Sequence, residues 1–291
     1  MKRAGPILGS RKPVDAVAKE DQAARFRHAE DGDETTMAAT TETLAGAFIA
    51  ARRGHKLVDI ATLPVPADVD AGFAAQAEVN QGMGYPLAGW KVSLGEGGRP
   101  MAGLMQGPYL KSGDTYRGVH GAELRVEIEL AIRLGRDMPL RPGQPYTREE
   151  LIDHCDAALV GIEIVESRIA DWTNVPFPLW LADAMGHGGY LLGPEVPFSI
   201  FDDVPALTCT VELDGDVLYD RQALHANGDP LVTALAWANR SVEGPLGPLK
   251  AGQIITTGSL CGGVLAPTVG PVIARLDPVT AISFALAEQG D

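Results

Sequence analysis

Leu124-Arg-Val-Glu-Ile-Glu-Leu-Ala-Ile-Arg-Leu134 alternates strictly along its length. Every even position is a large aliphatic residue, whereas the odd positions hold two arginines, two glutamates and an alanine. Successive side chains of a β-strand point to opposite faces, so this pattern predicts a strand with one apolar face. A helix with the same sequence would scatter the aliphatic residues around its whole surface.

Glu127 and Glu129 share the charged face of this predicted strand, one pleat apart. Two carboxylates about 4 Å apart repel by roughly 4 kcal/mol at an effective dielectric constant near 20. On a solvated face the side chains can separate, and the stretch is then a half-exposed strand with a polar outer face. In a pocket the repulsion needs a proton, an arginine or a hard cation such as Mg²⁺ or Mn²⁺. The stretch alone leaves both interpretations open.

Composition narrows the possible partners of the chain. Its 291 residues are 45% hydrophobic, enough for one large domain or two small ones, and the formal net charge is -14. This charge argues against nucleic acids and anionic membranes as partners. Three widely spaced cysteines indicate neither a disulfide framework nor a thiolate metal site, so we expect a reducing, cytoplasmic location. No long apolar run and no signal-peptide pattern is present.

The chain divides into three parts by pattern. Residues 1–36 are charged, poor in aliphatic residues and without periodicity, which predicts a disordered or loosely attached tail; Met37 is a possible true start. Residues 37–88 predict a helical segment, with a first helix between Thr41 and Gly54. Residues 89–291 are expected to form the catalytic domain.

Lys91 lies in a short apolar strand that begins at Gly89. Burial lowers the pKa of a lysine and makes it a possible base, whereas a lysine that reaches the surface is the alternative. The glycines and prolines between Gly103 and Gly121 predict a loop or lid. In the later strand 158–169, Glu163 and Glu166 fall on opposite faces, so only one of them can join Glu127 and Glu129.

Further along, local signals place several elements. They predict a helix from the capping box Thr147–Glu150 to about Asp156 and a hairpin between Thr208 and Tyr219. A second helix should run from Asp229 to about Arg240, and a strand should cover 253–259. Gly186–Gly189 predicts a tight turn; its His187 is either a turn residue or an acid or base aimed into the pocket.

Common enzyme signatures are absent from the sequence. It has no nucleotide-binding glycine pattern, phosphate loop, His-rich zinc signature or Gly-x-Ser-x-Gly elbow.

A series of short motifs nevertheless resembles a known family. In order along the chain they are Gly-Trp-Lys, Val-Glu-Ile-Glu, Gly-Ile-Glu-Ile-Val-Glu-Ser-Arg-Ile, Leu-Ala-Asp, Ala-Leu-Ala-Trp-Ala-Asn and Leu-Lys-Ala-Gly-Gln-Ile-Ile-Thr-Thr-Gly-Ser. Together they resemble the fumarylacetoacetate hydrolase superfamily, in particular its 2-oxopent-4-enoate hydratases and 4-oxalocrotonate decarboxylases. The resemblance covers about residue 40 to the C-terminus.

The resemblance implies an α+β fold rich in β structure, of the type of this superfamily's C-terminal domain, with helices near the N-terminus. It also implies a Mg²⁺ or Mn²⁺ ion at one end of the sheet. The metal ligands it implies are Glu127, Glu129 and Glu163; the catalytic candidates are Lys91, Asp183 and His187; the substrate-binding segment is Thr257, Gly258 and Ser259.

The implied activity is that of a metal-dependent hydro-lyase. It would add water to a 2-hydroxy-2,4-dienoate or 2-oxo-4-enoate and give a 4-hydroxy-2-oxo acid, in aromatic catabolism, as a homo-oligomer. A 2-oxo acid decarboxylase of the 4-oxalocrotonate type, a C–C hydrolase of 2,4-dioxo acids and a catalytically idle binding protein are the alternatives. The sequence departs from the hydratases in the segment after Lys91. It also departs after Asp183, where Ala184 stands in place of the family's Asn.

Overall fold

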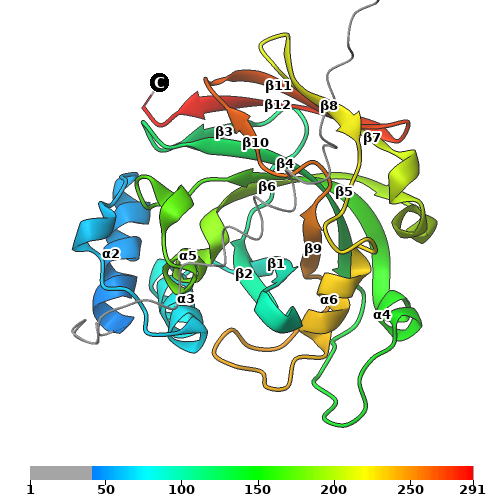
Figure 1. The fold of residues 1–291 in the computed structure, drawn as a ribbon, viewed down its shortest axis with the longest axis horizontal. Coiled ribbons are helices and arrows are strands. Elements are labelled where there is room, and N and C mark those ends of the chain that lie inside the picture. Colours follow the sequence, from blue (N-terminus) through cyan, green and yellow to red (C-terminus); the bar gives the residue numbers. More distant parts are fainter. Residues whose placement is uncertain (1–40, 291) are drawn as a thin grey trace, which may run out of the picture.

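Two β-sheets share one hydrophobic core in the computed structural model, which describes residues 41–290 (Figure 1). The predicted tail 1–36 and the possible start at Met37 lie outside the described residues. The mixed sheets, with helices near the N-terminal end of the described chain, confirm the predicted α+β fold.

The larger sheet has seven strands, and most of the predicted site residues lie on it. Six strands follow the order β2-β1-β9-β4-β5-β6, and β10 pairs with β4 outside this path. All pairs are antiparallel except β1 with β9. The strands are β1 (Leu87–Leu94), β2 (Pro100–Gln106), β4 (Leu124–Leu134), β5 (Cys155–Val165), β6 (His187–Val196), β9 (Ile254–Ser259) and β10 (Val264–Ala266).

The smaller sheet has five strands in the order β3-β12-β11-β7-β8. The predicted hairpin is confirmed, because β7 and β8 pair antiparallel around Asp214 and Gly215. The strands are β3 (Thr115–Gly118), β7 (Thr208–Leu213), β8 (Asp216–Gln222), β11 (Gly270–Asp277) and β12 (Thr280–Glu288).

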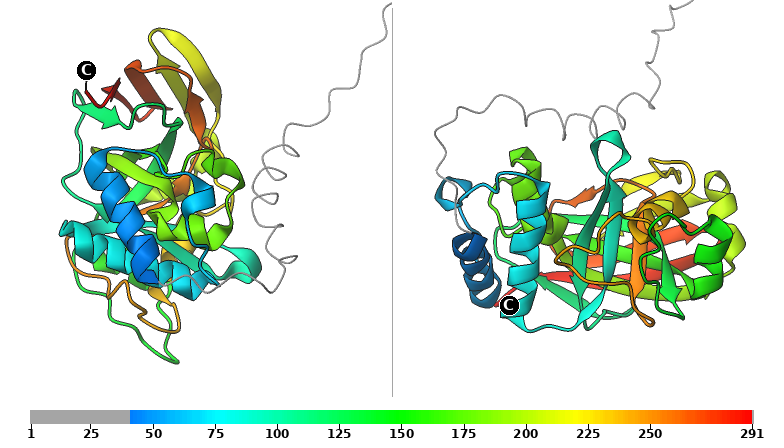
Figure 2. Two further views of the ribbon diagram at one scale, coloured as in Figure 1. Left: turned by 90° about the vertical axis from the view of Figure 1, so that its left-hand side faces the viewer. Right: turned by 90° about the horizontal axis from the view of Figure 1, so that it is seen from below.

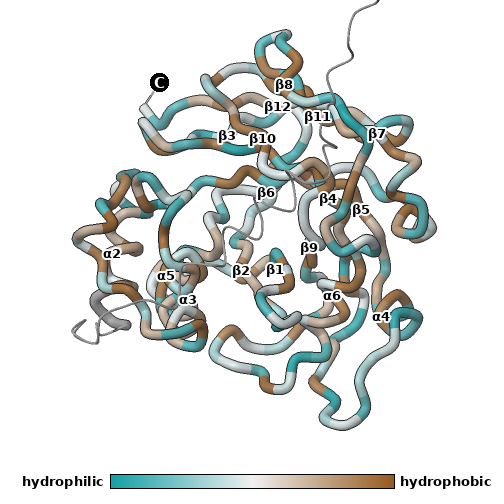
Figure 3. Tube along the Cα trace, viewed as in Figure 1, coloured by the Kyte–Doolittle hydropathy of each residue, from teal (hydrophilic) through white to brown (hydrophobic). Residues whose placement is uncertain are grey.

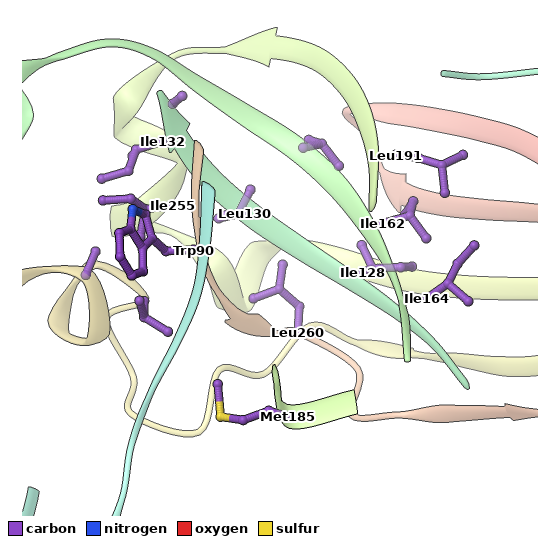
Figure 4. Close-up of a cluster of buried hydrophobic side chains, with 14 of the residues drawn as sticks. Trp90, Ile128, Leu130, Ile132, Ile162, Ile164, Met185, Leu191, Ile255 and Leu260 are labelled. Carbon is purple, nitrogen blue, oxygen red and sulfur yellow. The ribbon is translucent and has the colours of Figure 1, made fainter. Parts of the chain in front are cut away.

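The alternating stretch forms β4, at the centre of the larger sheet, as predicted. All six of its even-numbered aliphatic side chains are buried, and they belong to the main core together with residues of both sheets. Figure 4 shows Ile128, Leu130 and Ile132 of β4 beside Ile162, Leu191 and Trp90. Along the strands the trace changes repeatedly between hydrophobic and hydrophilic residues (Figure 3). This alternation is why the sequence predicts the strand so well.

Residues 41–290 contain five α-helices, of which α6 packs against β1, β9 and β2 of the larger sheet. Helices α2 and α3 pack against each other on one side, beside α5 (Figure 2). None of the helices in the described range is long and apolar enough to cross a membrane. The helices are α2 (Thr41–Gly54), α3 (Val69–Met83), α4 (Arg148–His154), α5 (Phe177–Ala182) and α6 (Leu231–Ala238). Short 3-10 turns occupy Ile60–Thr62, Glu96–Gly98, Trp172–Asn174, Ala184–Gly186, Phe198–Asp202 and Val204–Ala206.

The predicted helix starts are confirmed, but the ends differ slightly. Thr147 and Glu150 form the reciprocal capping box that opens α4. The helix ends at His154 rather than near Asp156, because β5 begins at Cys155. Helix α6 likewise ends at Ala238, two residues before the predicted Arg240.

The prediction of a loop between Gly103 and Gly121 is only partly right. Residues 107–114 connect two strands, but the stretch also contains the end of β2 and all of β3. Gly103 pairs with Lys91, and a Cβ atom built on it would lie 2.5 Å from the carbonyl oxygen of Ala184. Gly103 therefore allows two backbones to approach each other closely within a strand. Judged by composition alone, the same glycine indicates a loop.

A buried histidine secures the end of β9. His225 accepts a hydrogen bond at Nδ1 from the Asn227 amide (3.3 Å), so its other nitrogen, Nε2, donates to the Thr257 carbonyl (2.9 Å). Burial lowers the pKa of His225, and the hydrogen bond to Thr257 offsets this only in part. Protonation would place a second N–H against the Asn227 amide.

We expect His225 to make the fold sensitive to mild acid. Because its pKa is lower in the folded state than in the unfolded chain, its contribution to stability is present above the unfolded pKa, about 6.5, and is lost as the pH falls. Urea unfolding between pH 7.5 and 5 should show a smaller loss of stability in His225→Gln, which keeps a donor for Thr257. Parallel pH profiles of parent and variant would contradict this assignment.

Candidate functional site

Strand pairing brings three glutamates together. Glu127 and Glu163 lie directly opposite each other on β4 and β5, and Glu129 follows Glu127 on the same face of β4. One carboxylate oxygen from each of the three lies within 4.8 Å of the others. Glu166 is not part of this group, because its carboxylate accepts hydrogen bonds from the Tyr116 hydroxyl and the Val119 amide. Of Glu163 and Glu166, it is therefore Glu163 that joins Glu127 and Glu129.

The three carboxylates are not on a polar outer face. Glu129 is 1% exposed and Glu163 is fully buried, whereas Glu127 is half-buried. Burial and the neighbouring Glu163 and Glu127 raise the pKa of Glu129 well above its usual range. Glu163 Oε2 is buried and, among the described residues, has no hydrogen-bond partner. An all-oxygen set with an unused buried oxygen fits a hard divalent cation.

Lys91 provides a positive charge beside this group. Its Nζ lies 2.8 Å from Glu163 Oε1 and donates to the Met185 carbonyl at 3.0 Å. Its side chain is 13% exposed, so it does not reach out to the surface. Burial alone would lower the pKa of Lys91, but Glu163, Glu127 and Glu129 outweigh it and the pKa is raised. The sequence could not decide the direction of this shift.

His187 also contacts Glu163. The prediction of a tight turn at Gly186–Gly189 is wrong for this residue, because His187 is the first residue of β6 and pairs with Val165. Its Nδ1 lies 3.1 Å from Glu163 Oε1. Burial lowers the pKa of His187 despite this carboxylate. Conversely, burial would raise the pKa of Glu163, but Lys91 and His187 lower it.

Strand β9 contributes a hydroxyl that the sequence reasoning missed. The Thr256 hydroxyl donates to Glu129 Oε2 and accepts from Tyr190, at 3.0 Å. The predicted Thr257 lies on the alternate face, where its hydroxyl donates to the Leu130 carbonyl at 2.8 Å. Alternation along 253–259 could have separated the two threonines. Ser259 pairs with Glu129 across the strands, and its hydroxyl donates to the Gly262 carbonyl.

Gly258, between Thr257 and Ser259, has a left-handed φ of 111°. A Cβ atom there would lie 3.1 Å from His225 Nε2. The structure thus shows why a glycine suits this position, and the part it plays toward a substrate stays a prediction.

Asp183 lies in a second buried cluster, apart from the three glutamates. Its Oδ1 accepts from Arg52 Nη2 at 2.9 Å, and its Oδ2 accepts from the Ser167 hydroxyl and the Arg168 amide. The side chain is fully buried, and these donors occupy both oxygens. These contacts therefore do not support a direct action of Asp183 on a substrate.

The chain between the two clusters has an unusual backbone. Ala184 and Met185 have φ angles of 54° and 53°, and Gly186 follows with 68°. A left-handed conformation costs a residue with a side chain roughly 1–2 kcal/mol. Two such residues in succession persist only where their surroundings hold them.

Known proteins resemble this chain in sequence and in fold. The family model described as fumarylacetoacetate (FAA) hydrolase C-terminal matches residues 110–282, more than half of the chain. A 2-keto-4-pentenoate hydratase of Burkholderia vietnamiensis is 32% identical over 166 residues, which are 56% of this chain and 61% of that protein. The hydratase of the same name from Paraburkholderia phymatum matches to the same extent. The chain thus spans about 61% of the length of these curated relatives.

A solved structure shows the same fold. The 4-oxalocrotonate decarboxylase from Pseudomonas putida G7, complexed with magnesium and adipate, superposes with a TM-score of 0.68. The match covers 84% of this chain and 97% of that one, at 16% sequence identity. From the matched family model, with the strand arrangement in agreement, the chain belongs to the fumarylacetoacetate hydrolase family.

Proposed function

We propose that the protein is a divalent-metal-dependent hydro-lyase that acts on small 2-oxo acids. It would add water to a 2-hydroxy-2,4-dienoate or 2-oxo-4-enoate and give a 4-hydroxy-2-oxo acid. The observation that carries this proposal is the convergence of Glu127, Glu129 and Glu163 with the Nζ of Lys91 2.8 Å from Glu163. The naming of the sequence relatives as 2-keto-4-pentenoate hydratases supports the choice of reaction.

In this proposal the three glutamates hold Mg²⁺ or Mn²⁺. Glu163 Oε2 has no other partner among the described residues, and Glu129 is poised by the hydrogen bond from Thr256. When bound, such an ion supplies Lewis-acid stabilisation of negative charge on the oxygen of a 2-oxo group. Glu127 is the most exposed of the three, so a substrate would approach from its side.

Lys91 is the proposed proton-transfer group. Its ammonium is held between Glu163 Oε1 and the Met185 carbonyl. Lys91 would give a proton to the terminal carbon of the dienol and take up the proton of its 2-hydroxyl, which converts the dienol to the conjugated enone. Water then adds, its hydroxyl to the carbon β to the ketone and its remaining proton to the carbon α to the ketone. His187, also in contact with Glu163, is the second candidate for moving a proton.

The remaining assignments are proposals as well. We propose that Thr257, Gly258 and Ser259 form the backbone segment next to the substrate carboxylate, and that residues 89–291 form the catalytic unit behind the helical segment 37–88. The three free cysteines support a reducing, cytoplasmic location. A homo-oligomer acting in aromatic catabolism is the assembly and role that we expect, and light scattering of the purified protein would give the oligomer size.

The reaction itself is tested with three substrate probes. The purified protein is incubated with 2-hydroxypenta-2,4-dienoate, with and without Mg²⁺, and the dienol absorbance is followed. A Mg²⁺-dependent loss of absorbance with formation of 4-hydroxy-2-oxopentanoate supports the proposal. Release of CO₂ from a 2-oxo-enedioate alone, or cleavage of a 2,4-dioxo acid alone, would instead assign the decarboxylase or the C–C hydrolase. Turnover of none of them would indicate a binding protein.

Removing one proposed metal ligand should weaken metal binding. We expect Glu129→Gln to reduce Mn²⁺ affinity by roughly 10²-fold or more, because even partners of metal ligands are worth 10–100-fold. Titration calorimetry or Mn²⁺ electron paramagnetic resonance measures this directly. Glu212→Gln, which removes a partly buried carboxylate paired with Arg275 on the other sheet, is the matched control. Equal Mn²⁺ affinity in Glu129→Gln and parent would refute the site.

Removing the ammonium should affect turnover but not metal binding. We expect Lys91→Met to lower kcat by roughly 10²–10⁴-fold, the range for a positioned acid or base. Mn²⁺ affinity should be kept or raised, because the variant lacks a positive charge next to Glu163. Lys250→Met, at an exposed lysine paired with Asp137, serves as the control. Near-full turnover of Lys91→Met on every accepted 2-oxo acid would show that another group moves the proton.

A further inference from the structure

The left-handed turn Ala184–Gly186 directly contacts the proposed catalytic lysine. The carbonyl of Met185, in the middle of the turn, accepts the hydrogen bond from Lys91 Nζ at 3.0 Å. The carbonyl of Ala184 lies against Gly103, the β2 partner of Lys91, and a Cβ atom built on Gly103 would also lie 2.8 Å from Lys91 Cγ. The conformation of this turn thus decides where the ammonium is held relative to Glu163.

The turn does not hold this conformation by itself. Left-handed backbone is unfavourable for both Ala184 and Met185, so contacts elsewhere must compensate. One compensating contact is the hydrogen bond from the Glu166 amide to the Gly186 carbonyl, at 2.7 Å. Others come from Asp183, immediately before the turn: its carbonyl accepts from the Gly186 amide at 3.0 Å, and its carboxylate is fully buried in the second cluster.

Arg52 supplies the cation for that carboxylate. Its Nη2 lies 2.9 Å from Asp183 Oδ1, whereas Arg168 approaches the same oxygen only to 3.7 Å with its side chain. Arg52 lies on helix α2, more than 50 residues before the region that the family model matches, 110–282. The helical segment thus reaches the proposed catalytic lysine through three successive contacts: Arg52 with Asp183, Asp183 with the turn, and the turn with Lys91.

We propose that Arg52 is a positioning residue for the reaction: it fixes Asp183, and through the left-handed turn it holds the Met185 carbonyl against the ammonium of Lys91. This inference rests on the proposed role of Lys91 in proton transfer. An arginine that served only the packing of α2 would affect folding but not the placement of Lys91.

The first test separates placement from folding by kinetics. In Arg52→Met, kcat should fall by roughly 10- to 100-fold, the effect of displacing a catalytic group by about 1 Å. KM and Mn²⁺ affinity should stay within about twofold of the parent protein, since no proposed ligand is touched. Arg52→Lys should recover most of the lost turnover. Arg53→Met, which removes the exposed neighbouring arginine that donates to the Gly82 carbonyl, should have no effect. Unchanged kcat in Arg52→Met overturns the proposal.

The second test lowers the strain that Arg52 is proposed to hold. Ala184→Gly keeps every donor of Asp183 but removes the cost of left-handed backbone at that position. We expect Tm to stay the same or rise, and Arg52→Met added to this variant should cost less kcat than in the parent protein, because less strain remains for Arg52 to hold. Asp214→Gly, at the left-handed residue of the β7–β8 hairpin, relieves the same kind of strain far from the site and should not change the cost of Arg52→Met. An equal loss of kcat on Arg52→Met in the Ala184→Gly and parent backgrounds overturns the proposal.

A structural readout keeps this inference separate from the proposed reaction. In a crystal structure of Arg52→Met, Lys91 Nζ should have left hydrogen-bond distance of the Met185 carbonyl. If the parent protein turns over no 2-oxo acid, the proposed function fails, but this distance still decides the positioning role. An unchanged contact near 3.0 Å in this variant overturns it.

Discussion

Repulsion among three clustered carboxylates, two of them buried, is the constraint on which this structure depends. Each pair at about 4 Å costs roughly 4 kcal/mol at an effective dielectric constant near 20, and burial adds a desolvation cost. Lys91 and His187 both contact Glu163 and offset part of this cost. Burial and the charges of Glu163 and Glu127 raise the pKa of Glu129, and the Thr256 hydroxyl and Lys91 offset this only in part. A divalent cation between the carboxylates would compensate the remaining repulsion, in agreement with the metal-binding proposal.

The sequence revealed those parts of the site that obey strand periodicity. Alternation placed Glu127 and Glu129 on one face and separated Glu163 from Glu166, and the structure agrees on both points. It could not show that the face is covered, because burial of Glu129 depends on strands far away in the chain. Separation along the chain is also the reason why Thr256 was missed, because its partner Glu129 is 127 residues away. The apolar strand around Lys91 left both a base and a surface lysine possible, and the resemblance to a family decided between them.

The errors have a common physical origin. Glycine was read as a sign of loops at Gly103 and at Gly186–Gly189, whereas in the structure Gly103 and His187 belong to strands. At Gly103 and Gly188 the missing side chain makes room: a Cβ on Gly188 would lie 2.5 Å from the Tyr116 hydroxyl. The prediction of Asp183 as a catalytic group located a real feature, a carboxylate surrounded by Arg52, Ser167 and Arg168. Only its contacts show that it faces structural partners.

The order of the larger sheet has a consequence for folding. Lys91, Thr256, Glu129, Glu163 and His187 come from five strands that are neighbours in space, although Lys91 and Thr256 are more than 160 positions apart in the chain. Pairing of β1 with β9 joins the first and last of these strands in sequence, and such non-local contacts form slowly because a long loop must close first. The three carboxylates lie on β4 and β5, which follow each other in sequence, so Lys91 and Thr256 reach them only when β1 and β9 pair. A cation that bound the carboxylates in the finished sheet would stabilise it by mass action, so supply of the ion and completion of folding would be thermodynamically linked.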